Sequence, residues 1–310
     1  MKVFNNVNNF KTSQPTVVTI GTFDGVHIGH RKIINQLLEV SKEGYLSTLL
    51  TFFPHPRMVL QQSNDLKLIH TIKERQEELA KTGLENLVIQ AFTKEFSRLT
   101  ARAYVEEILV KGLQAKKVII GYDHRFGRNR TADIKDLHKF GNEFGFEVEE
   151  ISKQDIEDIA VSSTKIRKAI LAGNISLANQ YMNAQFSLEG KVVKGKGLGK
   201  DFGFATANLK IKETYKIIPA HGVYVVKGEI NSKLYYGMMN IGVNPTLGEN
   251  KQSLEVHFFD FNQDIYGEKI KVNLLKKIRN EKKFNDVDEL IKAMKKDKEF
   301  VINFINDESN

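Results

Sequence analysis

Residues 17–30 read VVTIGTFDGVHIGH, and this stretch decides the fold of the first half of the chain. The apolar run at residues 17–20 is typical of a buried strand, and residues 29–41 carry apolar side chains at helical spacing. His27 and His30 are therefore expected at the start of a helix that follows a strand directly.

The start of this predicted helix has an unusual charge pattern. His30, Arg31 and Lys32 lie at the positive end of the helix dipole, and no acidic residue follows until Glu39. A bound anion would resolve the conflict, because backbone N–H groups at a helix N-terminus favour phosphate and the imidazoles of His27 and His30 could donate to one oxyanion. A solvated basic surface or a histidine metal pair explains the same residues, so the motif alone leaves these interpretations open.

Length and composition restrict the class of protein. A chain of 310 residues with 41% apolar residues is long enough for about two domains. The absence of cysteine excludes disulfides, thiolate catalysis and cysteine metal sites. No apolar run approaches the roughly 20 residues that cross a bilayer, and no secretory signal is present, so we expect a cytoplasmic protein with no membrane partner.

The net charge of +8 favours anionic small molecules over nucleic acid as partners. The lysines are scattered among acidic residues, and the chain has no arginine-rich arm or basic tract with interleaved aromatic residues. Nothing in the sequence predicts an obligatory protein partner.

The hydrophobic period changes near residue 184. Between residues 17 and 181 short apolar runs alternate with helix-like segments, which predicts a parallel sheet wrapped by helices. Beyond residue 184 the period is two, which predicts an antiparallel barrel, and residues 286–305 return to helical spacing. The expected domains are therefore 1–183 and 184–310.

The expected strands of the first domain are 17–20, 47–53, 86–92, 117–120 and 146–151, and its expected helices are 29–41, 71–82, 101–111 and 132–141. The expected strands of the second domain are 186–193, 222–230, 234–241, 253–261 and 269–275. Asn231-Ser232 fits a hairpin turn between two of these strands.

Three further polar segments accompany the opening motif. Residues 51–56 (TFFPHP) end a predicted strand with two prolines, and residues 121–127 (GYDHRFG) follow another. Residues 162–167 (SSTKIR) open a helix with a capping hydroxyl and two cations. Ligands of such sheets bind at the carboxyl ends of the strands. Taken singly, each segment could be only a turn, a solvated loop or a helix cap.

In this order, the segments resemble the bifunctional bacterial riboflavin kinase and FAD synthetase family, and the resemblance covers nearly the whole chain. It implies a Rossmann-like nucleotidyltransferase domain of the His-x-Gly-His type, which transfers AMP from ATP to FMN and releases pyrophosphate. The FMN phosphate is already anionic near neutral pH, so positioning and charge stabilisation must supply the catalysis.

The resemblance also implies roles for residues of the first domain. His27 and His30 are expected to contact the ATP phosphates and the transition state, and Asp123 to face the nucleotide. The residues expected to shape the loop are Gly21, Phe23, Asp24, Gly25 and Gly29, and those expected to contact phosphate are Ser163, Thr164 and Arg167.

A glycine- and lysine-rich segment, GKGLGK at residues 195–200, is a second candidate phosphate site. Closely spaced glycines let backbone N–H groups approach phosphate, although hairpin loops are often rich in the same residues. Thr206 and Asn208 point to the same side of an extended segment and offer the hard oxygen ligands that Mg²⁺ accepts. By the resemblance, Gly195, Gly197 and Lys200 bind phosphate and Thr206 and Asn208 bind Mg²⁺, in a kinase barrel that phosphorylates riboflavin.

Phosphorylation of riboflavin requires a group that accepts the hydroxyl proton. In residues 254–261 (LEVHFFDF) strand alternation places Glu255 and His257 on one face. The residues alone fit a surface carboxylate or a Glu-x-His metal pair; the resemblance makes Glu255 the general base and assigns Arg279 to substrate contact.

The chain departs from the family at Lys200 and Ala205, where Arg and Pro are usual. Lys keeps the positive charge of Arg but cannot make its two parallel hydrogen bonds to phosphate, and Ala leaves the loop less restricted than Pro before binding. The departures therefore predict weaker nucleotide binding. They do not predict lost catalysis, because Thr206, Asn208 and Glu255 remain. The expected substrates and partners are riboflavin, FMN and ATP as co-substrate, with Mg²⁺ as cofactor. The alternatives are an FMN adenylyltransferase whose barrel only binds flavin, and a nucleotide- or RNA-binding protein without enzymatic activity.

Overall fold

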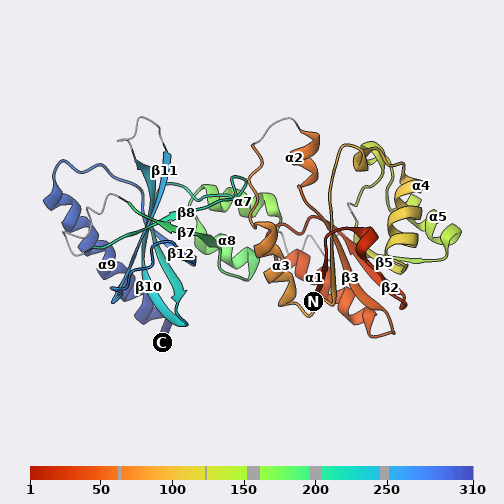
Figure 1. The fold of residues 1–310 in the computed structure, drawn as a ribbon, viewed down its shortest axis with the longest axis horizontal. Helices are drawn as coiled ribbons and strands as arrows, with labels where there is room; N and C mark the ends of the chain where they lie inside the picture. The colour runs from red at the N-terminus through yellow and green to blue at the C-terminus, as the bar shows by residue number, and fades with distance from the viewer. Residues whose placement is uncertain (62–64, 123, 152–160, 196–203, 245–250, 310) are drawn as a thin grey trace. The chain divides into compact units, whose positions relative to one another are not determined.

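The computed structural model describes residues 1–61, 65–122, 124–151, 161–195, 204–244 and 251–309 (Figure 1). The contacts between residues divide the chain into two units, Met1–Ser163 and Thr164–Asn310.

The first unit is built on a parallel sheet of six strands in the order β1-β4-β3-β2-β5-β6. The strands are β1 (Lys2–Phe4), β2 (Thr16–Ile20), β3 (Leu46–Phe52), β4 (Asn86–Gln90), β5 (Ala115–Gly121) and β6 (Glu147–Ile151). The chain leaves β2 toward β3 on one side and later returns to β5 on the other. This reversal creates a switch point at the carboxyl end of β2, which is where sheets of this kind bind ligands.

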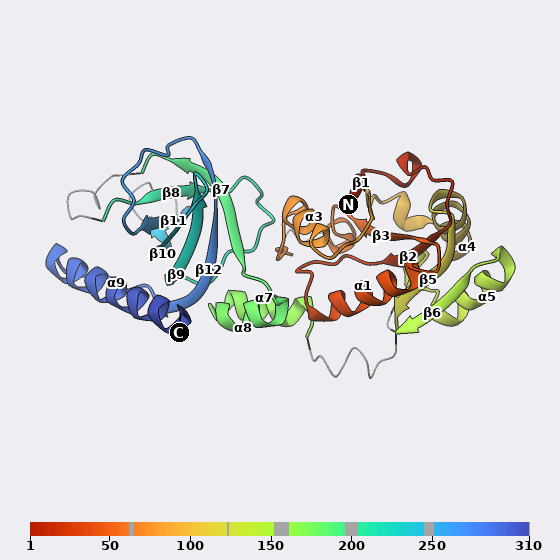
Figure 2. The same cartoon turned by 90° about the horizontal axis from the view of Figure 1, so that it is seen from below.

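Helices cover both faces of this sheet. Val17 of β2 packs with α1 (Ile28–Ser41) and α3 (Ile72–Ala80), while Val18 packs on the opposite face, against the helical segment α4–η3 (Ala101–Tyr104 and Val105–Gly112) and α5 (Ile134–Phe144). Figure 2 shows α1 running along the sheet. The shorter elements are η1 (Val7–Asn9), α2 (Pro56–Leu60), η2 (Phe96–Arg98) and η4 (Arg128–Arg130). Burial on both faces explains why the strands read as continuous apolar runs.

The second unit contains a closed antiparallel barrel with the strand order β10-β11-β8-β7-β12-β9. Its strands are β7 (Ser187–Val193), β8 (Ala207–Lys210), β9 (Gly222–Ile230), β10 (Lys233–Asn244), β11 (Lys251–Phe258) and β12 (Lys269–Arg279). In β11 the apolar residues Leu254, Val256 and Phe258 are buried, as alternation predicts. The final helix α9 (Val287–Ser309) packs through Val301 against a cluster that includes Val225 and Met238.

The predicted fold class is confirmed, and the helices and strands differ from prediction mainly where they are short. Strands β1 and β8 were not predicted, because three or four residues without an apolar run carry no periodic signal. Residues 56–60 form a short helix that was not predicted; Pro56 fits the first helical position and the His55 side chain caps it. Asn231 and Ser232 form the predicted hairpin turn with φ angles of 51° and 60°.

Helices α7 (Ser163–Leu171) and α8 (Ile175–Met182) lie mostly in the second unit, although the sequence places residues 164–183 in the first domain. The amide of Asn179 donates to the carbonyl of Leu274 at 2.9 Å, and the hydroxyl of Ser176 donates to the carbonyl of Leu275 at 3.3 Å. These side-chain contacts dock α8 on β12, and no pattern along the sequence signals them.

Candidate active sites

His27 and His30 form a stacked pair at the N-terminus of α1. The His27 ring is buried, and its Nδ1 accepts the backbone N–H of His30 at 3.3 Å. A nitrogen that accepts carries no proton, so the neutral ring presents its proton on Nε2. The two ring centroids are 3.6 Å apart at an interplanar angle of 19°. No acidic residue lies in the first turn, so the predicted positive helix end is present.

The loop between β2 and α1 has a strained backbone. Phe23 and Val26 adopt φ angles of 47° and 38°, a region that β-branched residues such as Val avoid. The Phe23 ring lies 4.8 Å from that of His30. A Cβ at Gly29 would lie 3.3 Å from the His27 ring, so glycine leaves room for the imidazole. Backbone strain of this kind persists where the surroundings fix the chain, which is typical of functional loops.

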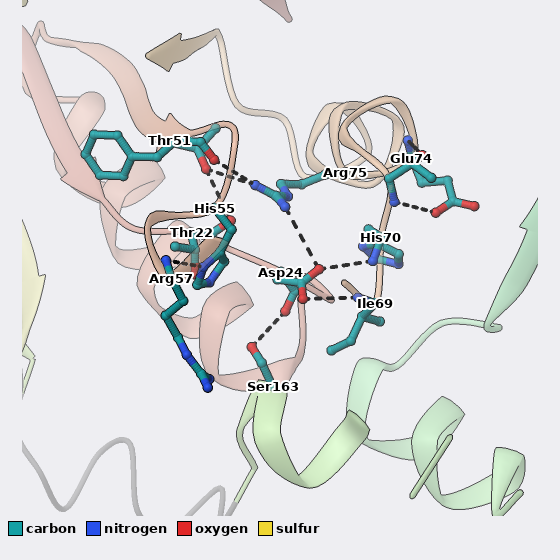
Figure 3. A network of polar contacts seen from close by, with 12 residues as sticks. Thr22, Asp24, Thr51, His55, Arg57, Ile69, His70, Glu74, Arg75 and Ser163 are labelled. Atoms are coloured by element: carbon teal, nitrogen blue, oxygen red, sulfur yellow. Dashed lines mark hydrogen bonds and ion pairs between the residues drawn. The ribbon is translucent and has the colours of Figure 1, made fainter. Parts of the chain in front are cut away.

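Asp24 anchors this loop (Figure 3). Its carboxylate accepts the backbone N–H groups of Ile69 at 3.1 Å and His70 at 3.0 Å. The Arg75 guanidinium lies 3.9 Å from the same carboxylate, and both side chains are fully buried. These contacts hold the Asp24 side chain in place, and its role in shaping the loop stays a prediction. Gly21 and Gly25 lie in the same loop, and the Gly21 N–H donates to the carbonyl of Leu50 at 3.0 Å, which extends the pairing of β2 with β3.

Arg75 was missed by the sequence analysis. Its guanidinium also contacts the Thr51 hydroxyl at 3.3 Å and the Phe52 carbonyl at 3.5 Å, so it joins the loop between β2 and α1 to the end of β3. The spacing of Ile72, Arg75 and Leu79 places the arginine on the apolar face of its helix. A cation on such a face is the signal that could have revealed it.

The other predicted phosphate ligands of the first domain are only partly placed. The Ser163 hydroxyl donates to the backbone carbonyl of Asp24 at 2.9 Å, so Ser163 also ties the loop (Figure 3). Thr164 and Arg167 follow in α7 and belong by contacts to the second unit, and their phosphate contacts stay a prediction. Asp123 lies outside the described residues.

An aromatic cluster, which sequence reasoning did not identify, lies where β3, β4 and β5 end. It consists of Phe52, Phe92, Phe96, Tyr104 and Phe126, and successive ring centroids are 5.6 to 6.1 Å apart. Tyr104 and Phe126 are buried, whereas the other three rings are half-buried. The cluster therefore presents apolar rings near the switch point of the sheet.

In the barrel, the strand register places Glu255 opposite two amide side chains. Glu255 pairs with Asn208 of β8 and with Asn240 of β10, so the three side chains lie in one row on one face. A Cβ at Gly195 would overlap the side-chain amide of Asn208, so the predicted phosphate loop starts directly against a predicted metal ligand. Gly197 and Lys200 lie outside the described residues.

The oxygen donors next to Asn208 fit Mg²⁺. The amide oxygen of Asn208, the hydroxyl oxygen of Thr206 just before β8 and the Glu255 carboxylate are hard oxygen donors. Within the described part of the chain, no group of three His, Asp or Glu side chains could hold a metal ion. Mg²⁺ beside ATP needs few protein ligands, because phosphate oxygens and waters complete its coordination.

Arg279, predicted to contact substrate, has a protein partner in the structure. Its Nη2 and Nε donate to the Asp297 carboxylate of α9 at 2.8 and 2.9 Å, and the ring of Phe284 lies 5.6 Å from the guanidinium. A bidentate pair of this kind fixes α9 to β12. Substrate contact by Arg279 stays a prediction.

Two family models match the chain, one for each half. Residues 9–165 match the model described as FAD synthetase and residues 182–305 match the model described as riboflavin kinase. The chain is therefore a two-domain transferase with a nucleotidyltransferase module and a kinase module. Over its whole length it belongs to the family of bifunctional riboflavin kinases/FMN adenylyltransferases. The second model begins at residue 182, whereas the contacts divide the chain after Ser163, so the predicted domain boundary after residue 183 stays a prediction.

Relatives of this family are similar along nearly the entire chain. The bifunctional riboflavin kinase/FMN adenylyltransferase of Buchnera aphidicola subsp. Schizaphis graminum is 36% identical over 99% of both chains. That of Bacillus subtilis is 34% identical over 94% of this chain and 93% of its own. The crystal structure of a macrolide-efflux protein from Streptococcus pneumoniae has the same fold, with a TM-score of 0.88 and 34% identity over 97% of this chain and 98% of its own.

These matches confirm the predicted family. The riboflavin kinase model favours the bifunctional interpretation over an adenylyltransferase with a binding-only barrel and over an RNA-binding protein. Among the helices that the structure describes, none is both long and apolar enough to span a bilayer.

Proposed function

We propose that His27 and His30 bind the ATP phosphates while AMP is transferred to FMN, and that Glu255 accepts a proton while riboflavin is phosphorylated. The stacked histidine pair at the N-terminus of α1 is the observation that carries the first assignment. The Asn208–Glu255 pairing carries the second.

In the adenylylation, an oxygen of the FMN phosphate attacks the α-phosphorus of ATP, and the bond to pyrophosphate breaks. Negative charge develops on the phosphate oxygens, and imidazole N–H groups together with the helix N-terminus stabilise it. The Asp24 anchor supports this role, because it holds the loop that orients both rings. No general base is required, since the attacking oxygen is anionic near neutral pH.

In the phosphorylation, the riboflavin hydroxyl oxygen attacks the γ-phosphorus of ATP, the bond to ADP breaks, and Glu255 takes the hydroxyl proton. Thr206 and Asn208 would hold Mg²⁺, which neutralises phosphate charge when bound. Asn208 faces Glu255 across the strand pair, so the base and the nucleotide-side ligand share one face.

The aromatic cluster of the first unit supports a site for the flavin ring. Planar apolar ligands stack on aromatic side chains, and the half-buried rings of Phe52, Phe92 and Phe96 are the surface offered. The partners in this proposal are riboflavin, FMN and ATP, without nucleic acid or an obligatory protein partner. Both reactions consume ATP, which fits a cytoplasmic location.

Product chromatography tests the proposal. The purified protein is incubated with riboflavin, ATP and Mg²⁺ and, separately, with FMN, ATP and Mg²⁺. FAD is expected from both mixtures, with FMN appearing first in the riboflavin mixture. The double variant His27→Ala/His30→Ala should accumulate FMN without FAD, while His138→Ala, which changes an exposed histidine of α5, should behave as the parent. Equal loss of both products in folded double variant would overturn the two-site assignment.

A further inference from the structure

His257 makes a contact that neither family role explains. It lies in β11 two residues after Glu255, and its Nδ1 is 2.8 Å from the backbone carbonyl oxygen of Ala205. A carbonyl oxygen only accepts, so Nδ1 carries a proton and donates it. The ring is thereby committed to a hydrogen bond with the main chain.

The bonded carbonyl lies one residue before the predicted metal ligand Thr206. Among the residues that the structure describes, the backbone pairing of β8 with β11 has two residue pairs, Asn208 with Glu255 and Ala207 with Val256. Thr206 lies just beyond the last of these pairs. The His257 side chain therefore continues the connection between the strands past the point where the ladder ends.

The orientation of the imidazole is fixed from two sides. The rings of Phe204 and Phe259 contact it edge to face, with centroids 5.2 and 5.5 Å away. Both phenylalanines are buried in the cluster that contains Val301 of α9. The donor therefore belongs to a rigid packed surface and not to a freely rotating side chain.

We infer that His257 is a positioning residue of the kinase reaction, which holds the segment from Ala205 to Asn208 in place against the strand that carries Glu255. The hydrogen bond keeps Thr206 and Asn208 on the same face of the barrel as Glu255. The distance between the predicted metal ligands and the predicted base therefore stays fixed. This inference rests on the proposed roles of Thr206, Asn208 and Glu255.

Three substitutions separate this role from general packing. His257→Phe keeps an aromatic ring between Phe204 and Phe259 but removes the donor, and His257→Leu removes both. His257→Asn restores a donor, because the amide nitrogen of Asn occupies the place of Nδ1. All three are made in the full chain, and thermal unfolding together with FAD formation from FMN reports whether each variant is folded.

The first measurement is hydrogen exchange of the peptide covering residues 204–210 in the protein without substrate. Exchange is expected to be about fivefold faster in the Phe and Leu variants, which is the effect of one lost hydrogen bond, and close to the parent in the Asn variant. The second measurement is FMN formation as a function of Mg²⁺ concentration. The half-saturating concentration should rise about fivefold in the Phe and Leu variants and return toward the parent value in the Asn variant.

The outcomes are distinct. Unchanged exchange in folded Phe or Leu variants would overturn the tether itself. Faster exchange with an unchanged Mg²⁺ requirement would overturn the positioning role. Absence of FMN formation by the parent protein would overturn the proposed kinase function, and the exchange experiment would still test the tether.

Discussion

The carboxylate of Asp24 lies 3.9 Å from the guanidinium of Arg75, and neither side chain is exposed to solvent. Asp24 belongs to the loop that leads into α1 and its two histidines, and Arg75 belongs to α3, which packs on the same face of the sheet as α1. The pair therefore couples the geometry of the loop between β2 and α1 to the core of the first unit.

Loss of Arg75 should destabilise the first unit. Arg75→Met leaves the buried Asp24 carboxylate without its cation, which costs about 3 to 5 kcal/mol of unfolding free energy. Chemical denaturation is the measurement. The matched control is Lys42→Met, which removes the exposed pair with Glu39 and should cause little measurable loss. Equal stability of the two variants would contradict a supporting role of the buried pair.

Substitution of Gly29 should slow FAD formation without lowering the stability of the protein. In Gly29→Ala the new Cβ lies 3.3 Å from the His27 ring, so the imidazole must move. Since a small misplacement of a reacting group is costly, FAD formation from FMN should fall on the order of tenfold. Alanine favours helix more than glycine does, so the melting temperature should not fall. FMN formation from riboflavin serves as the internal control, and an unchanged rate of FAD formation would show that His27 tolerates the shift.

Glu255 should be required for FMN formation but not for FAD formation. Glu255→Gln keeps the shape of the side chain but removes the proton acceptor, so FMN formation should fall about 10²- to 10⁴-fold. FAD formation from supplied FMN should stay at the parent rate. Glu229→Gln changes an exposed carboxylate of the same barrel and should alter neither activity. Retained FMN formation in Glu255→Gln would require another base.

Hydrophobic periodicity predicted the longer helices and strands, in which many residues alternate regularly between core and solvent. The alternation in β11 placed Glu255 opposite the core side chains correctly, and strand-turn-helix spacing placed both histidines at the start of α1. Strand β8 was missed, because its four residues become a strand only by pairing with β7 and β11.

Contacts between distant segments could not be predicted for a similar reason. The Asp24–Arg75 pair joins a loop to a helix that begins many residues later, and the aromatic cluster draws its rings from the end of β3 and from segments that follow β4 and β5. One sequence reports which residues are present, whereas these sites depend on how the sheet order brings them together.

Tyr224 should give the barrel a specific sensitivity to alkaline pH. Burial raises the pKa of its phenol to about 12, and the hydroxyl donates to the backbone carbonyl of Ala220 at 2.5 Å. Because the proton is held more tightly in the folded chain than in the unfolded one, the stabilisation is complete below the unfolded pKa of about 10. It is lost as the pH rises from there through the folded value.

Denaturation of the parent and of Tyr224→Phe at several pH values between 9 and about 12 measures this contribution. The free energy of unfolding should fall more steeply with pH in the parent, because the variant has no phenol to ionise. Tyr266→Phe, at a half-exposed position in the same unit, should follow the parent. Parallel curves for the parent and Tyr224→Phe would mean that the buried phenol does not contribute to the alkaline unfolding of the barrel.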